Sequence, residues 1–259
     1  MLFRTRTRRL FVCALLLCAV ACGGKKPLLP PGTMQPDRFL FDRGNEELKK
    51  KHWADARTYF QQIVDNYPQS TLRADAKLGM GDTYLGENTS ESGVLAANEF
   101  KEFLSFYPTS ARADYAQYKL AMSHFAKMRK PERDQSETRE AVKEFDVFFE
   151  RYPDSALTPE VKQKWREARD RTTEAAYRVG VFYFRVHWYP GAIARFRQIL
   201  AEDAGFSTRD GVYYHLAESL ARTDKKAEAI PYFERLLAEF TNSEFLLEGR
   251  KRLEALKAQ

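Results

Sequence analysis

The segment AVKEFDVFFERYPDSAL, residues 141–157, contains the pattern that decides the fold. An alanine is followed by an aromatic residue four positions later, an apolar residue three positions after that, and then an aromatic residue with proline. This spacing places the apolar side chains on one face of a helix. The closing proline cannot donate a backbone hydrogen bond and disfavours helical geometry in the residue before it, so the helix is predicted to end there.

The same pattern occurs five times along the chain. The alanine–aromatic pairs are Ala56 and Phe60, Ala96 and Phe100, Ala141 and Phe145, Ala192 and Phe196, and Ala229 and Phe233. Three copies close on a proline (Pro68, Pro108 and Pro153), the fourth closes on Asp203-Ala204, and the fifth on Phe240-Thr241. Small residues recur at a matching set of positions upstream of the alanines: Gly44, Gly81, Ala121, Gly180 and Ala217. This arrangement is typical of tetratricopeptide repeats.

We therefore predict an all-α fold, a right-handed superhelical stack of about five tetratricopeptide helical hairpins. The small residues would let the two helices of a hairpin cross closely, and the aromatic residues would fill the space between one hairpin and the next. No segment shows sustained strand-type alternation of apolar and polar residues.

The repeats are unevenly spaced, and the extra residues fall at identifiable places. We expect residues 86–93 to lengthen the turn of the second hairpin, residues 127–139 to lengthen that of the third, and residues 158–185 to form one long helix. Insertions in turns leave the stacking positions intact and create loops for contacts. The long helix is predicted to act as a hinge between repeats 1–3 (residues 37–156) and repeats 4–5 (residues 157–259).

Residues 1–21 are predicted to be a lipoprotein signal peptide. Four arginines precede an apolar run that is too short to span a bilayer with any margin. The ending Ala19-Val20-Ala21-Cys22 resembles a bacterial lipobox, so Cys22 is expected to carry lipid (palmitate) and to become the new N-terminus. An ordinary signal peptide is the alternative. By the same resemblance, Gly23 after the cysteine points to the outer membrane.

A flexible tether is predicted over residues 22–36, because GGKKPLLPPGTMQP is rich in glycine and proline and has no periodicity. Arg8-Arg9 also resembles a twin-arginine signal. The sequence leaves open whether export uses that route or the general secretory (Sec) route.

The composition excludes several classes of protein. With 30% charged residues, 13 Tyr and 19 Phe, the chain is too charged for a polytopic membrane protein and too aromatic for a disordered one. The net charge is +6, but four of the 42 basic residues lie within residues 4–9, and the remaining 38 nearly balance 36 acidic ones. A nearly neutral body argues against a nucleic-acid partner, which needs clustered cations.

No catalytic site, metal site or cofactor is predicted, and the protein is expected not to be an enzyme. The four histidines, His52, His124, His187 and His215, are isolated from one another along the chain. Two of them, His52 and His187, are expected in turns between helices. The mature chain would keep only the lipidated Cys22, which excludes a disulfide framework or a zinc ribbon. Residues Lys49-Lys50-Lys51 are interpreted as complementing a helix dipole, with a lipid-headgroup patch as the alternative.

What remains is a binding surface. In a stack of hairpins the first helices line a concave groove that suits an extended peptide, or a partner's helix or loop. Tyr84, Tyr115, Tyr118 and Tyr214 lie on predicted first helices. They would either project into the groove as partner contacts or belong to the core.

Together with the lipobox and the tether, the phrases FQQIVDNYPQSTLRADAKLGMGDTYL and AVKEFDVFFERYPDSALTPEVKQKWREARDR resemble the BamD family, the tetratricopeptide lipoproteins of the β-barrel assembly machinery. The resemblance implies a lipid-anchored scaffold on the periplasmic face of the outer membrane. It implies a BamA-like barrel subunit on the C-terminal repeats, other Bam lipoproteins as further partners, and unfolded outer-membrane protein segments on the N-terminal repeats. Arg195 falls where the family has an arginine at the BamA contact, and Arg197 is the alternative position.

Two other readings stay open at this point. One is a tetratricopeptide adaptor of another envelope system, such as a Tol–Pal-like coordinator, although that family usually carries an N-terminal coiled coil that residues 23–36 lack. The other is an activator of an enzyme that acts on peptidoglycan.

Overall fold

The computed structural model describes residues 29, 30 and 32–258 of the chain. Within this part every regular element is an α-helix: α1 (Pro36–Lys49), α2 (Trp53–Asn66), α3 (Arg73–Glu87), α4 (Ser90–Phe106), α5 (Ala113–Phe125), α6 (Ser136–Arg151), α7 (Thr158–Arg185), α8 (Tyr189–Glu202), α9 (Arg209–Ala221), α10 (Lys226–Glu239) and α11 (Leu246–Lys257). The predicted all-α fold is confirmed.

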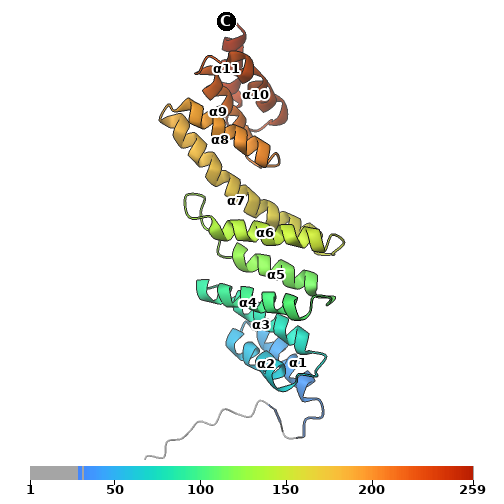
Figure 1. Cartoon of the computed structure of the whole chain (residues 1–259). Coiled ribbons are helices and arrows are strands. Elements are labelled where there is room, and N and C mark those ends of the chain that lie inside the picture. Colours follow the sequence, from blue (N-terminus) through green and yellow to red (C-terminus); the bar gives the residue numbers. More distant parts are fainter. Residues whose placement is uncertain (1–28, 31, 259) are drawn as a thin grey trace, which may run out of the picture.

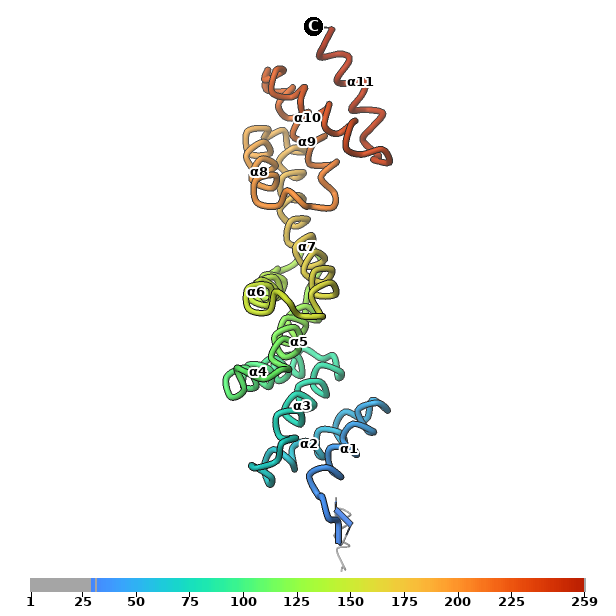
Figure 2. Tube along the Cα trace, turned by 90° about the vertical axis from the view of Figure 1, so that its right-hand side faces the viewer, coloured from blue at the N-terminus to red at the C-terminus, as the bar shows by residue number. Residues whose placement is uncertain are grey.

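The helices form an elongated stack. Figure 1 shows them following one another in chain order, from α1 at one end to α11 at the other. Seen from the side, the second helices α4, α6 and α8 lie to one side of the first helices α3, α5, α7 and α9 (Figure 2). The five predicted hairpins run from α1–α2 to α9–α10, and α11 is a further helix that the sequence pattern did not predict. No helix in the described part combines the length and apolarity needed to cross a membrane.

Aromatic rings fill the spaces between the helices. The five pattern aromatics are all 0% exposed: Phe60, Phe100, Phe145, Phe196 and Phe233. A Cβ built on Gly44 of α1 would lie 2.6 Å from Phe60 Cε1, and a Cβ on Gly79 of α3 would lie 2.6 Å from Phe60 Cε2. The ring of Phe60 therefore occupies a space between α1 and α3 that exists only because neither helix has a side chain there.

Serines after the first and third closing turns link consecutive first helices. Helix α2 ends just before Tyr67-Pro68, and α6 ends just before Tyr152-Pro153. The hydroxyl of Ser70 then donates to Asp37 at 2.6 Å, and that of Ser155 donates to Asp114 at 2.6 Å. Each acceptor lies in the first turn of the preceding first helix, so the serines hold first helix to first helix along the stack.

Helix α7 has the bounds predicted for the long helix and is shared between two hydrophobic cores. Val161 and Ala168 in its N-terminal half belong to the core built with α5 and α6. Ala176 and Tyr177 in its C-terminal half pack against the core of α8, α9 and α10. The serine that follows the fourth hairpin, Ser207, donates to Asp170 at 2.6 Å and so reaches the middle of α7. The role of α7 as a hinge stays a prediction.

The prediction that residues 86–93 lengthen the turn of the second hairpin was wrong. Helix α3 continues to Glu87 and α4 begins at Ser90, so the extra residues lengthen helices and leave a turn of two residues. Asn88 ends α3 with a left-handed backbone (φ 53°), and Thr89 caps α4 by accepting from the Ser92 backbone at 3.0 Å. A small polar segment can thus be helical when a side chain satisfies the free amides of its first turn.

The third insertion is a loop, but its bounds differ from those predicted. It covers residues 126–135, because residues 136–139 already belong to α6. The carboxylate of Asp134 accepts from the Ser136 hydroxyl at 2.9 Å and stabilises the start of α6.

Candidate partner-binding surface

Two of the four tyrosines predicted on the first helices bridge neighbouring helices. The hydroxyl of Tyr115 donates to Asp82 Oδ2 at 2.7 Å, and Tyr118 donates to Glu160 Oε1 at 2.6 Å. Burial and the neighbouring carboxylate raise the pKa of both hydroxyls, so both remain protonated donors. Tyr118 is only 6% exposed and packs in the core with Phe145. Its side chain thus serves the fold, and a partner contact there stays a prediction.

Tyr84 lies nearer the surface, beneath an arginine. The Arg57 guanidinium is 4.0 Å from the centre of the Tyr84 ring and forms an ion pair with Glu87 at 2.5 Å. A cation over an aromatic face is favourable, and the ion pair holds the arginine in place. A partner would therefore meet the Arg57–Tyr84 pair and not a bare ring. Tyr214, the remaining tyrosine, is half-buried and stacks on Phe245 with ring centres 4.8 Å apart.

The two arginines predicted at the partner contact differ in what they already bind. Arg197 is exposed and forms an ion pair with Glu228 of α10. Arg195 donates to Gln198 one turn along α8 at 3.0 Å. Because a contact within one helix turn is easily exchanged for another, Arg195 is the better placed of the two to meet an acidic partner, and its role stays a prediction.

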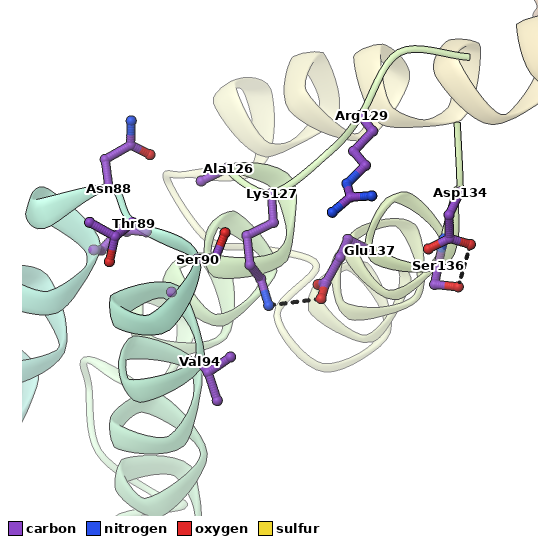
Figure 3. A pocket seen from close by; sticks show the side chains of 12 residues that line it. Asn88, Thr89, Ser90, Val94, Ala126, Lys127, Arg129, Asp134, Ser136 and Glu137 are labelled. Atoms are coloured by element: carbon purple, nitrogen blue, oxygen red, sulfur yellow. Dashed lines mark hydrogen bonds and ion pairs between the residues drawn. The ribbon is translucent and has the colours of Figure 1, made fainter. Parts of the chain in front are cut away.

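A polar cavity of about 490 Å³ lies between the second and third hairpins (Figure 3). The α3–α4 turn contributes Asn88 and Thr89, and the 126–135 loop contributes Lys127 and Arg129. On the far wall Glu137 accepts from Lys127 Nζ at 2.9 Å and from His124 Nδ1 at 2.8 Å. Burial raises the pKa of Glu137, but these two hydrogen bonds outweigh it, so the carboxyl titrates below its usual range. Lys127 and Glu137 thus neutralise each other within the cavity.

A buried ion pair joins the two helices of the fourth hairpin, between α7 and the residue that follows α8. Arg166 donates to both oxygens of Asp203, at 2.9 and 2.5 Å, and the Thr173 hydroxyl donates to Asp203 Oδ2 at 2.7 Å. Burial raises the pKa of Asp203, but the bonds from Arg166 and Thr173 outweigh it and the net pKa lies below the usual value. The sequence held one signal of this site: Asp203 stands where the first three copies of the pattern have a tyrosine.

The histidines remain apart from one another, as their spacing suggested. His52 and His187 lie in the turns before α2 and α8, as predicted, and His215 packs among aromatic rings. In the described part of the chain, Glu47, His52 and Asp55 bring three ligand-type atoms within 4.8 Å of one another. Glu47, however, already accepts from Lys50 at 2.9 Å and lies 2.7 Å from His52 Nδ1. The absence of a metal, like the absence of a catalytic site, stays a prediction.

The lipidation residue predicted from the sequence, Cys22, lies outside the described residues. The signal peptide and most of the tether lie outside them as well. Of the predicted tether, residues 29, 30 and 32–36 are described, and Pro36 begins α1.

Comparison with known proteins places the chain in a family. Residues 34–217 match the YfiO family, described as an outer membrane lipoprotein, and residues 212–243 match a tetratricopeptide repeat. The outer membrane protein assembly factor BamD of Caulobacter vibrioides is 25% identical over 232 residues, which are 88% of this chain and 74% of that protein. BamD of Xylella fastidiosa is 24% identical over 160 residues, 58% of this chain and 54% of that protein.

Among solved structures, the TPR2AB domain of yeast Sti1 in complex with pHSP90 is 10% identical, with a TM-score of 0.43 over 85% of this chain and 98% of that one. The family match spans α1 to α9, more than half of the chain, and the repeat match covers most of the α9–α10 hairpin. This chain therefore belongs to the YfiO family of outer membrane lipoproteins, and it is similar to the BamD assembly factors.

Proposed function

We propose that this chain is a lipid-anchored scaffold that takes part in the assembly of outer-membrane proteins. The family match over residues 34–217 is the observation that carries the proposal. Relatives that cover most of this chain are named outer membrane protein assembly factors, which supports the same role. The alternatives of a Tol–Pal-like coordinator and a peptidoglycan-enzyme activator gain no support from the family match.

The mechanism we propose is binding without chemistry. The stack offers long faces of helices at fixed spacing, and affinity would come from complementary surfaces on a BamA-like barrel subunit, on other Bam lipoproteins and on unfolded outer-membrane protein segments. The acylated Cys22 would hold the stack at the periplasmic face of the outer membrane. Links such as Ser155 to Asp114 and Tyr118 to Glu160 support this role, because they keep the helices in register while a partner is bound.

Depletion in the native host tests the function. Loss of the protein should lower the amounts of folded outer-membrane proteins, and affinity purification from detergent-solubilised envelopes should recover a BamA-like subunit. Normal outer-membrane protein levels after depletion, with no barrel-assembly subunit recovered, would refute the proposal. Cys22→Ser should abolish labelling by palmitate and release the protein from the outer-membrane fraction.

The same purification tests the arginines. Arg195→Ala should reduce recovery of the partner more than Arg197→Ala, because Arg197 is already paired with Glu228. Arg235→Ala is a matched control, because Arg235 is exposed on α10 and donates to Glu239 within its own helix at 2.9 Å. Equal recovery from all three variants would remove Arg195 and Arg197 from the contact.

A further inference from the structure

Exposed apolar side chains are concentrated at the C-terminal end of α7. Phe182, Val186 and Trp188 are 59%, 53% and 54% exposed and fall within seven consecutive residues. Single exposed apolar residues are ordinary, whereas a cluster that includes an exposed phenylalanine and a tryptophan indicates a surface that is covered in use. Trp188 is also held in place, because its ring packs edge-on against Tyr183 with centres 4.6 Å apart.

Cations lie beside this cluster, on the loop of residues 126–135. Arg129, Lys130 and Arg133 are all exposed there, and in the described part of the chain none of their side chains forms an ion pair. The carboxylates of the same loop are already engaged, since Glu132 pairs with Arg178 and Asp134 binds Ser136. The loop therefore presents uncompensated positive charge.

The loop and the apolar cluster form one surface. The Arg171 guanidinium donates to the Arg129 carbonyl at 3.1 Å, and Glu132 pairs with Arg178, so the loop is fastened along α7. Figure 3 shows the loop that carries Arg129 running beside another helix of the stack. Phe182 lies four residues after Arg178 and so shares its helix face. We call Arg129, Lys130, Arg133, Phe182, Val186 and Trp188 the basic–aromatic patch.

Helix dipoles do not account for these charges. At this side of the stack α5 ends at Phe125 and α6 begins at Ser136, so a negative helix end and a positive helix end lie next to each other. Arg129, Lys130 and Arg133 are in the loop between them, beyond the last turn of α5 where a cation would complement the dipole.

We propose that the basic–aromatic patch rests on the surface of an anionic phospholipid bilayer. The three cations would lie against headgroup phosphates, and Phe182, Val186 and Trp188 would enter the boundary between headgroups and acyl chains, where tryptophan and other apolar side chains are favoured. A bilayer is the fitting occupant because the patch combines positive charge with apolar side chains at the exposed end of a helix. It is also the surface that the predicted acyl chain on Cys22 would keep within reach. In this respect the proposal rests on the proposed function.

Vesicle flotation tests the patch apart from the anchor. The chain from residue 22 onward, with Cys22→Ser so that no lipid is attached, should float with vesicles of phosphatidylcholine and phosphatidylglycerol in equal parts and not with phosphatidylcholine alone. Binding should weaken as salt rises toward about 0.15 M, because screening shortens the reach of surface charge to about 8 Å. The triple variant Arg129→Glu, Lys130→Glu, Arg133→Glu should lower partitioning by more than about tenfold, since each cation near an anionic surface contributes a factor of about five.

Matched controls separate the patch from general charge and apolarity. Lys101→Glu, Lys162→Glu and Lys251→Glu together remove three exposed cations from α4, the N-terminal half of α7 and α11, and should weaken binding several-fold less than the patch variant. Phe182→Ala should lower partitioning, whereas Phe106→Ala should not, although Phe106 of α4 is 70% exposed. Circular dichroism of each variant establishes that the fold is kept.

Trp188 supplies a direct readout of the interface. In a variant with Trp53→Phe and Trp165→Phe it is the sole tryptophan, and its emission should shift to the blue on anionic vesicles and be quenched by brominated lipid. Lack of flotation on anionic vesicles, or flotation without any change at Trp188, overturns the proposal. If the patch variants lose a protein partner in the envelope purification while vesicle binding is absent, the patch is a protein-docking surface. None of these outcomes depends on whether the chain assembles outer-membrane proteins.

Discussion

A Cβ built on Gly180 of α7 would lie 2.5 Å from Phe196 Cε1 on α8. Phe196 is fully buried and also packs against Tyr177, with ring centres 5.9 Å apart. The glycine is therefore required by packing, since its backbone does not have the positive φ that would require glycine for conformational reasons. The close approach of α7 and α8 depends on this one missing side chain.

Gly180→Ala should destabilise the fourth hairpin. Overpacking of this kind costs about 1–3 kcal/mol, and the better helix preference of alanine returns about 1 kcal/mol at most. Urea denaturation followed by circular dichroism measures the change. Combining it with Phe196→Leu should cost less than the sum of the two single changes, because the smaller side chain frees the space.

Gly93→Ala is the control for this position. A Cβ there would meet the Lys127 side chain, with Cδ at 3.2 Å, Cγ at 3.5 Å and Cε at 3.6 Å, and a shift of a few tenths of an ångström in that side chain makes room for it. Its stability should be equal to or above that of the unmodified protein. A Gly180→Ala variant as stable as Gly93→Ala would contradict the packing described here.

Asp203→Asn should weaken the link between α7 and the end of α8 by about 2 kcal/mol, because Arg166 loses the carboxylate that it binds through both oxygens and keeps one charged partner, Asp170, at 2.9 Å. Hydrogen exchange should rise in α8 and α9 before it rises in α5 and α6. Glu132→Gln is the comparison, since both Glu132 and Arg178 are about half exposed and such pairs contribute less than about 1 kcal/mol. Equal losses for the two substitutions would show that burial does not matter at Asp203.

The ionisation of Asp203 adds an acid dependence. Its folded-state pKa lies below the usual value for aspartate, about 3.9. The carboxylate therefore stabilises the fold fully above about pH 4, and this contribution is lost as the pH falls through the folded-state pKa. The Asp203→Asn variant should lose less stability than the unmodified protein in this range of pH.

His215 should make the C-terminal repeats less stable in mild acid. Its ring lies 5.1 Å from that of Phe184 and 5.4 Å from that of Phe245, and burial lowers its pKa below the usual 6.5. Because the unfolded chain takes up the proton more readily, this contribution to stability falls as the pH drops from about 6.5 toward the folded-state pKa.

Urea midpoints between about pH 5 and pH 7.5 measure this dependence across the ordinary titration range of histidine. His215→Leu should flatten the curve, and His187→Asn, at an exposed turn, should leave it unchanged. An unaltered slope in His215→Leu would assign the dependence to another group.

Lys51 and His187 both adopt a left-handed backbone with φ 61° at the end of a first helix. This conformation destabilises the fold by about 1–2 kcal/mol for a residue that has a Cβ, and glycine avoids that cost. Glycine also makes the unfolded chain more flexible, which destabilises the fold by about 0.4–1 kcal/mol, so the net effect of glycine is a small gain in stability. Lys51→Gly should therefore raise the melting temperature slightly, and Lys51→Val should lower it. A lower melting temperature for Lys51→Gly than for the unmodified protein would contradict the strain.

Several elements could be predicted because their signals are local. The long helix over residues 158–185 follows from a continuous helical pattern between two turns, and the helix ends before Tyr67-Pro68 and Tyr152-Pro153 follow from what proline forbids. Residues 86–93 were predicted incorrectly because glycine, serine and asparagine favour loops, whereas the Thr89–Ser92 capping box starts a helix among them. Helix α11 was missed because it has no second helix with an alanine–aromatic pair after it.

The sequence by itself determined the five helical hairpins, the helix ends before Tyr67-Pro68 and Tyr152-Pro153, and the pattern aromatics of the core, because these features depend on spacing within one or two turns of chain. The tertiary structure decided which residues of different helices meet, because the spacing of residues along the chain does not specify such contacts. It paired Arg166 with Asp203 across 37 residues, placed Tyr118 against Glu160 instead of in an open groove, and fastened the 126–135 loop along α7 next to Phe182. These contacts join helices whose separation and rotation are set by the summed packing of every hairpin between them, so they exist only once the stack is built.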